Sequence, residues 1–264
     1  MEELFTRGSQ DWEHFLAAMV LAMVRLSGVV AVAPFFSSQV IPRQAKALFV
    51  IVVAALLAPA IASLPSAHAV LGVMPVAGEL CVGLLFGFCL GLWSEILLFA
   101  GQVLGGQFSF SLVNLLDPNS RIETPLMSQM LSLFGVMVLL TAGMDRTLLA
   151  AVMRSYVAVP LGAALIGGRT MLAVVPMMGG VFFASLQLAA PVLAATMLVE
   201  VAVALIGKMS PQLPVMAITV PAKTMMGYLL LLGSLALWPH MLEAHFVRFL
   251  DLAERILREG ALQT

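Results

Sequence analysis

Long apolar segments separated by short polar breaks make up most of the chain. The first runs from Phe15 to Val32, the second from Ala45 to Leu64 and the third from Val70 to Leu104. A segment of about 20 apolar residues matches the hydrocarbon core of a bilayer, which is roughly 30 Å thick. The pattern therefore predicts membrane-spanning helices. The third segment is too long for one perpendicular span, so it is either a long tilted helix or a hairpin hinged near its glycines.

The second half of the chain repeats this pattern. Leu126 to Ala142 is apolar, "GMDR" interrupts it briefly, and the apolar sequence then continues to a break at "GGR". Two further segments, Leu172 to Ile206 and Val215 to Leu237, are joined by the turn "GKMSPQLP". Pro191 lies in the middle of the first of these, where a kink or a turn is expected. About six hydrophobic segments result, and they predict an all-α integral membrane protein.

The tail, residues 239–264, has a different pattern. Between Pro239 and Glu259 the apolar residues recur at helical spacing on one side, and the charged residues occupy the other. This is the pattern of an amphipathic helix. It predicts either a helix that lies on the membrane surface or one that docks on a partner, and the sequence does not separate the two.

Composition agrees with the membrane assignment. The chain is 61% hydrophobic and 10% charged, whereas soluble domains are about 25% charged. Its net charge of -1 provides no basic field for nucleic acid, so no nucleic-acid partner is expected. The acidic start lacks the positive region of a signal peptide, and the first apolar segment is expected to stay in the mature protein.

Motifs for catalysis or metal binding are not found in the sequence. Cys81 and Cys89 are eight residues apart, which is about 12 Å along a helix and too far for a disulfide. The histidines form no HExxH motif and no cluster with cysteine, and no nucleotide-binding or nucleophile motif occurs. We therefore expect neither a metal, nor a cofactor, nor an enzymatic activity.

Charged residues inside the apolar segments are the first candidates for a functional role. A charge at the centre of a bilayer costs about 2.5–3.5 kcal/mol, so such residues usually face a protein interior or a wet cavity. They either pair and lock helices together or relay protons or substrate, and we favour pairing. We assign four of them to helix–helix and subunit contacts: Arg25, Glu79, Glu200 and Lys223. Glu95 is a fifth such charge.

Methionines form a second pattern. Met127, Met130, Met137 and Met144 recur at spacings of three and seven residues, which predicts one helical face. Such a face either packs adaptably around a partner of varying shape or, more often, takes part in ordinary side-chain packing.

Four stretches together resemble a known family. They are "RLSGVVAVAPFFSSQVIPRQAK", "GGQFSFSLVNLLDPNSRIETPLMSQ", "YVAVPLG" and "GKMSPQLPVMAITVPAK", and they occur in that order over roughly Phe15 to Pro239. This order and spacing resemble the FliR family of flagellar biosynthetic proteins, to which the SctT proteins of injectisomes are related. The Asp117–Pro118 step and Pro125 look more like the flagellar branch.

The resemblance implies a fold, a place and a set of partners. Residues about 13–170 would form a FliP-like part and residues about 171–238 a FliQ-like hairpin, built from kinked helical hairpins around a channel. With FliP-like and FliQ-like subunits, the chain would form the flagellar type III export gate in the bacterial inner membrane, within the basal body. FlhB-like and FlhA-like proteins would adjoin it, membrane lipid would surround it, and unfolded polypeptides would pass through. We assign the hairpin bends to Pro191, Pro211, Gln212 and Pro221.

The polar and apolar stretch after Gly105 is the second candidate site. In the family that it resembles, the matching segment is a loop that plugs the channel. Gly105 and Gly106 would supply flexibility, Asp117–Pro118 would form a turn, and a greasy plug could block ions by dewetting. A plain re-entrant loop is the alternative. The predicted plug comprises Gly106, Gln107, Phe108, Phe110, Leu112, Val113, Leu115, Leu116, Asp117 and Pro118.

Two other functions remain open at this point. One is an injectisome gate subunit of the SctT type. The other is a small secondary transporter, because broken helices and intramembrane charges are typical of transporters. The sequence has no paired short segments in corresponding halves, and this disfavours the transporter.

Overall fold

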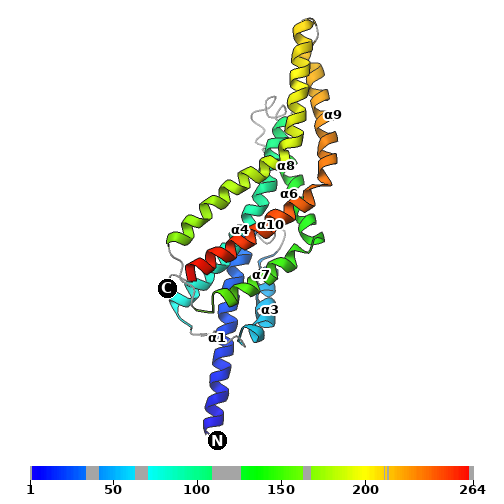
Figure 1. The fold of residues 1–264 in the computed structure, drawn as a ribbon. Coiled ribbons are helices and arrows are strands. Elements are labelled where there is room, and N and C mark those ends of the chain that lie inside the picture. Colours follow the sequence, from blue (N-terminus) through cyan, green and yellow to red (C-terminus); the bar gives the residue numbers. More distant parts are fainter. Residues whose placement is uncertain are drawn as a thin grey trace, which may run out of the picture. The chain divides into compact units, whose positions relative to one another are not determined.

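The computed structural model describes residues 2–33, 42–62, 71–108, 126–162, 168–210, 212 and 214–261, and within these ranges every regular element is a helix. Figure 1 shows their order along the chain. The helices are α1 (Glu2–Val32), α3 (Arg43–Ala62), α4 (Val73–Gln107), α6 (Leu126–Thr141), α7 (Met144–Ala158), α8 (Gly168–Met209), α9 (Val215–Leu235) and α10 (Trp238–Ala261).

Five of these helices are long and apolar enough to cross a membrane: α1, α3, α4, α8 and α9. The number rises to six if α6 and α7, which are bent at the break between them, form one broken span. The predicted all-α integral membrane protein is therefore confirmed.

The longest apolar segments are single helices. α4 has 35 residues and α8 has 42, so at a rise of 1.5 Å per residue they are about 52 Å and about 63 Å long. Both exceed the roughly 30 Å hydrocarbon core of a bilayer. The hinged hairpin that the third segment allowed is wrong. A turn at Pro191 is also wrong, because α8 continues through that residue.

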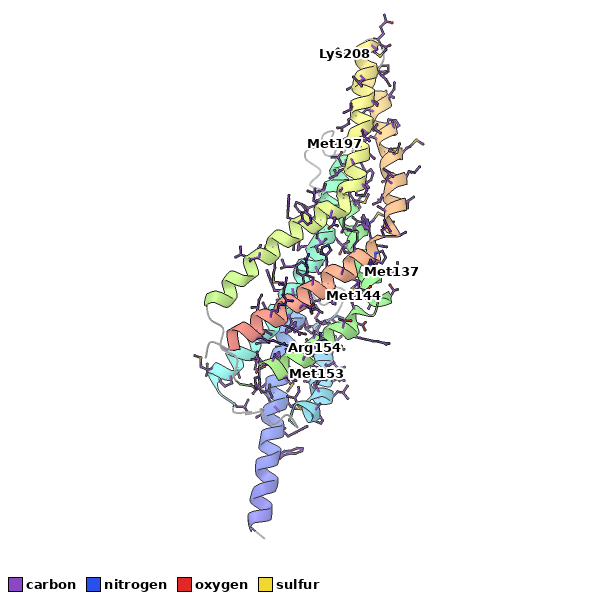
Figure 2. The ribbon with its side chains drawn as sticks, viewed as in Figure 1. Met137, Met144, Met153, Arg154, Met197 and Lys208 are labelled. Atoms are coloured by element: carbon purple, nitrogen blue, oxygen red, sulfur yellow. The ribbon has the colours of Figure 1, made fainter. Side chains whose placement is uncertain are left out.

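Gly143 causes the break that "GMDR" predicted. Its φ of 68° and ψ of 26° are left-handed values, which glycine adopts without the steric penalty of a Cβ. α6 therefore ends at Thr141 and α7 begins at Met144. Figure 2 labels Met137, which lies on α6, and Met144, the first residue of α7. The predicted single methionine face is wrong, because Met144 belongs to a different helix and the three methionines of α6 do not share one environment. Met127 and Met144 are buried, whereas Met130 and Met137 are exposed.

The chain divides into two compact units. Unit 1 comprises Met1–Leu92, Gly143–Met177 and Phe246–Thr264, and unit 2 comprises Trp93–Ala142 and Met178–His245. Neither unit is continuous in sequence.

Close contact between α1 and α4 organises unit 1. A Cβ added at Gly28 would lie 2.8 Å from the carbonyl oxygen of Leu80, and one added at Gly87 would lie 2.8 Å from that of Val29. A Cβ at Gly83 would collide with the carbonyl of Arg25. Small residues four apart allow membrane helices to approach backbone to backbone. The glycines of α4 therefore set the register of the two helices.

Unit 2 contains a comparable contact between the end of α4 and α6. A Cβ at Gly101 would lie 2.7 Å from the backbone nitrogen of Ser128, whose hydroxyl donates to the carbonyl of Leu98 (2.9 Å). Trp93 Nε1 donates to the carbonyl of Leu242 at the start of α10 (3.0 Å). Both side chains thus satisfy their polar atoms inside an apolar core.

The amphipathic tail forms α10, and its apolar face is covered by the protein itself. The buried residues are Leu242, Phe246, Phe249, Leu250, Ala253, Ile256 and Leu257. On the other side, Glu243, Arg248 and Asp251 are exposed. The helix was predicted correctly, but both proposed uses of its apolar face are wrong, because that face belongs to the core.

Candidate functional site

Arg25 on α1 and Glu79 on α4 form a buried ion pair in unit 1. Both side chains are 0% exposed. Arg25 Nε donates to Glu79 Oε2 at 2.6 Å, and Nη2 donates to Oε1 at 3.1 Å. Two parallel, charge-assisted hydrogen bonds are the strongest geometry available to these side chains.

The remaining donors of Arg25 reach the end of α7. Nη1 donates to Ser155 Oγ (2.9 Å), and Nη2 also donates to the carbonyl of Val159 (3.1 Å). The guanidinium lies 4.0 Å from the centroid of the Tyr156 ring, a cation–π distance. The pair thus joins α1 and α4 to the end of α7.

Glu79 holds the turn that follows α7. Its Oε1 accepts the backbone N–H of Gly162 at 3.0 Å, and Gly162 has a left-handed φ of 80°. The network satisfies the charges on both side chains within the protein. This arrangement supports pairing as the role of Arg25 and Glu79 and gives no support to a proton relay.

The partners at the end of α7 and directly after it were missed at the level of sequence. Ser155, Tyr156 and Val159 carry no charge, so nothing in the apolar pattern marks them. The available signal was the stretch "YVAVPLG", Tyr156 to Gly162, which carried part of the family resemblance without an assigned role.

Glu200 and Lys223 form the second ion pair, between α8 and α9 in unit 2. Its environment is different, because the Glu200 side chain is 49% exposed and that of Lys223 is 13% exposed. Glu95 on α4 is exposed as well.

The helices α8 and α9 leave most of their apolar surface uncovered. Within an apolar 18-residue stretch of each helix, only 22% of the residues of α8 and 11% of those of α9 are buried, against 56% of those of α4. Figure 2 shows Met197 and Lys208 along α8, with Lys208 in its last turn. The exposed apolar side chains of the two helices include Met197, Leu198, Val201, Leu205, Met225, Leu229 and Leu232.

Of the residues predicted to form hairpin bends, one lies between the two helices and others lie inside them. Gln212 lies between α8 and α9, where the turn was predicted. Pro191 and Pro221 lie inside α8 and α9, so they do not separate helices. Pro211 lies outside the described residues. The role of these residues as bends stays a prediction.

The first residues of the predicted plug are described, and two of them are helical. Gly106 and Gln107 belong to the last turn of α4, and Phe108 follows with its N–H bonded to the carbonyl of Leu104 (3.1 Å). The helix continues through the two glycines, and the residues that follow them contact α8 and α9 of the same unit: Gln107 contacts Thr196, and Phe108 stacks on Tyr228. The other predicted plug residues lie outside the described residues: Phe110, Leu112, Val113, Leu115, Leu116, Asp117 and Pro118.

Comparison with known proteins gives one consistent result. Residues 16–249 match the family described as "Bacterial export proteins, family 1". The flagellar biosynthetic protein FliR of Escherichia coli K12 is 21% identical over 95% of this chain and 97% of its own length. FliR of Caulobacter vibrioides is 26% identical over 85% and 90%. The surface presentation of antigens protein SpaR of Salmonella typhimurium is 27% identical over 83% of each chain. The family match covers most of the chain, which therefore belongs to family 1 of the bacterial export proteins.

Proposed function

We propose that this chain is a membrane component of the flagellar type III protein export gate. The observation that carries the proposal is the family match over residues 16–249, together with relatives named flagellar biosynthetic protein FliR that align over nearly their whole length. In this role the chain is a structural part of a channel and not a catalyst. Its place would be the bacterial inner membrane, in the flagellar basal body.

The hairpin of α8 and α9 supports assembly with other membrane subunits. It presents apolar side chains on most of its surface and carries the half-exposed Glu200 beside Lys223. Large uncovered apolar surfaces mark sites of interaction with protein or lipid. We assign this surface to FliP-like and FliQ-like subunits, with FlhB-like and FlhA-like proteins adjoining the assembled gate.

The lengths of α4 and α8 support the same conclusion. Helices of about 52 Å and about 63 Å cannot lie perpendicular within a bilayer core of roughly 30 Å unless part of each leaves that core. Apolar helices that leave the bilayer need protein around them. An assembly of several chains supplies that environment, and a channel for unfolded flagellar proteins can pass through its centre.

The loop that follows Phe108 is proposed to be the plug of that channel. Deleting Gln107 to Leu115 should raise ion leak across the membrane of cells that contain the assembled gate. Unchanged leak in a gate that still assembles would reject the plug, because an apolar constriction that blocks ions by dewetting cannot be removed without effect.

Export itself tests the proposed function. A strain that lacks its own copy of this chain should secrete no flagellar subunits, and a plasmid copy should restore them to the medium. A second plasmid carries the variant Val201→Asp, which places a charge on the exposed apolar face of α8. This variant should be made and inserted but should restore no export. Full secretion without any copy of the chain would contradict the proposal.

The likeness to SpaR favours a second candidate, a gate subunit that serves a system other than the flagellum. The same strain separates the two functions. Loss of flagellar subunits from the medium supports the flagellar gate, whereas normal flagella together with loss of other secreted proteins supports the alternative.

A further inference from the structure

The helices α1 and α3 lie side by side in unit 1 (Figure 1), and a groove runs between them. The groove has a volume of about 620 Å³, within the range of about 300–1,000 Å³ that is usual for ligand pockets. Its walls include Val20, Val24 and Ala31 of α1 and Ala47 and Val50 of α3. The groove is therefore large enough to hold a small molecule or part of a larger one.

Small side chains keep the groove open to the outside of the chain. Ser27, Ala31 and Ala47 all line it, and all three are exposed. The hydroxyl of Ser27 donates to the carbonyl of Val24 in its own helix (2.7 Å), so that donor is already used. The walls are thus mainly apolar, which favours the burial of hydrocarbon.

One end of the groove is basic. Lys46 is the one charged side chain among the described residues that line it. Arg43 is exposed and lies three residues earlier in α3, hence on the same face of that helix as Lys46. The sequence of α3 contains no acidic residue. The groove therefore joins mainly apolar walls to a positive end.

The length and charges of α3 place this basic end at the level of lipid headgroups. α3 has 20 residues, so it is about 30 Å long, which matches the hydrocarbon core of a bilayer. Its only charged residues, Arg43 and Lys46, are in its first turn, and every later residue is apolar. Basic side chains near the end of a membrane helix extend toward the headgroup region. The polarity of the groove thus follows the polarity of a lipid molecule.

We propose that the groove between α1 and α3 binds an anionic phospholipid. An acyl chain lies against the apolar walls, and the phosphate accepts hydrogen bonds from Lys46 and Arg43. Basic pockets between membrane helices bind acidic lipid headgroups in this way. The site selects a class of lipid, which goes beyond the proposed export function and does not depend on it.

The test measures lipid binding to the full-length chain in mild detergent by native mass spectrometry. The probes are phosphatidylglycerol and phosphatidylcholine with identical acyl chains, and the wild-type chain should bind phosphatidylglycerol more tightly. A basic residue at a membrane surface strengthens the binding of anionic lipid by roughly fivefold. Lys46→Gln should therefore weaken phosphatidylglycerol binding by about that factor and leave phosphatidylcholine binding unchanged.

Lys208→Gln is the matched control for the charge. Lys208 lies in the last turn of α8 and is not among the described residues that line the groove. Its substitution removes the same charge from the chain and should change the binding of neither lipid. Equal binding of the two lipids to the wild-type chain would overturn the proposal. So would a Lys46→Gln variant that binds phosphatidylglycerol as well as Lys208→Gln does.

A second pair of variants tests the apolar walls. Ala47→Phe fills the groove and should weaken the binding of both lipids, because both need room for an acyl chain. Ala55→Phe is its control, since Ala55 is also exposed on α3 but is not among the described residues that line the groove. Equal lipid binding by the two variants would show that the lipid lies elsewhere. If Ala47→Phe does not fold, Ala31→Leu fills the same groove with a smaller side chain and takes its place.

The same measurement on the complex with co-expressed FliP-like and FliQ-like chains separates a lipid from a protein occupant. The phosphatidylglycerol should stay bound in that complex. Its loss on assembly would show that a neighbouring chain fills the groove, and the lipid site would be wrong. If no complex forms, the proposed export function fails, whereas the measurements on the isolated chain still decide the lipid site.

Discussion

The two intramembrane ion pairs resemble each other in the sequence and differ in the structure. Arg25 and Glu79 are both 0% exposed and are surrounded by hydrogen-bond partners from α7 and the turn after it. Lys223 and Glu200 are 13% and 49% exposed, on helices that leave most of their surface uncovered. The first pair completes the interior of unit 1. The second lies on a surface that the isolated chain does not cover, as expected for a subunit contact.

The choice of cation fits this difference. Arginine offers a planar fork of five donors, and here the fork serves a carboxylate, a hydroxyl and a carbonyl at once. Lysine carries a compact charge on a flexible stem and suits a pair that must adjust to a neighbour.

The largest expected effect comes from breaking the buried pair. Arg25→Met leaves Glu79 uncompensated in the core, which should lower the stability of the chain by about 3–5 kcal/mol. The change is measurable as loss of folded chain in a thermal melt in mild detergent. Arg25→Met combined with Glu79→Leu should recover most of that loss. A single variant as stable as the wild type would show that the pair does not hold unit 1 together.

The next effect tests the helix contact that buries this pair. Gly83→Ala places a Cβ against the carbonyl of Arg25 and should destabilise the chain by about 1–3 kcal/mol through overpacking. Gly91→Ala in the same helix is the matched control, since its Cβ would meet Val32 Cγ1 at an ordinary 3.9 Å. Equal melting temperatures for the two variants would contradict the close approach of α1 and α4.

A smaller effect is expected at the partner that the sequence did not reveal. Ser155→Ala removes the hydroxyl that accepts from Arg25 Nη1 and should cost about 1–3 kcal/mol, toward the lower end because the other contacts of Arg25 remain. The same thermal melt measures it. No loss of stability would mean that the hydroxyl is dispensable to the buried network.

The smallest effect on the isolated chain should come from the exposed pair. Lys223→Met should change its stability by less than about 1 kcal/mol, as partly exposed pairs usually do. The same substitution should lower the yield of gates assembled with FliP-like and FliQ-like subunits. A large loss of stability together with normal assembly would show that this pair stabilises the chain itself and is not a subunit contact.

The sequence predicted the helices better than it predicted their contacts. The lengths of the apolar segments predicted the bounds of α3, α8 and α9 and the end of α1 within a few residues. α1 starts earlier than its apolar segment. The charges inside the apolar segments were also recognised. Their partners were not, because Glu79 and Glu95 look alike in a run of apolar residues. Glu79 faces Arg25 only because Gly83 and Gly87 set the register of α4 on α1.

The candidate loop was predicted in part for a similar reason. Two adjacent glycines favoured a flexible start, but Gln107 and Phe108 are fixed by residues about 90 and 120 positions further along the chain. The tail was likewise predicted only in part. The amphipathic pattern identified α10 but not what covers its apolar face, since a core, a membrane and a partner all select the same spacing.

The mass of the particle that this chain yields when it is co-expressed with its proposed neighbours tests the central claim most directly. A tagged copy would be co-expressed with FliP-like and FliQ-like chains, extracted in mild detergent and weighed by native mass spectrometry. The account predicts one large complex that contains a single copy of this chain and several copies of the others, and a much reduced amount of that complex with Val201→Asp. A stable monomer that ignores both neighbours would contradict the account.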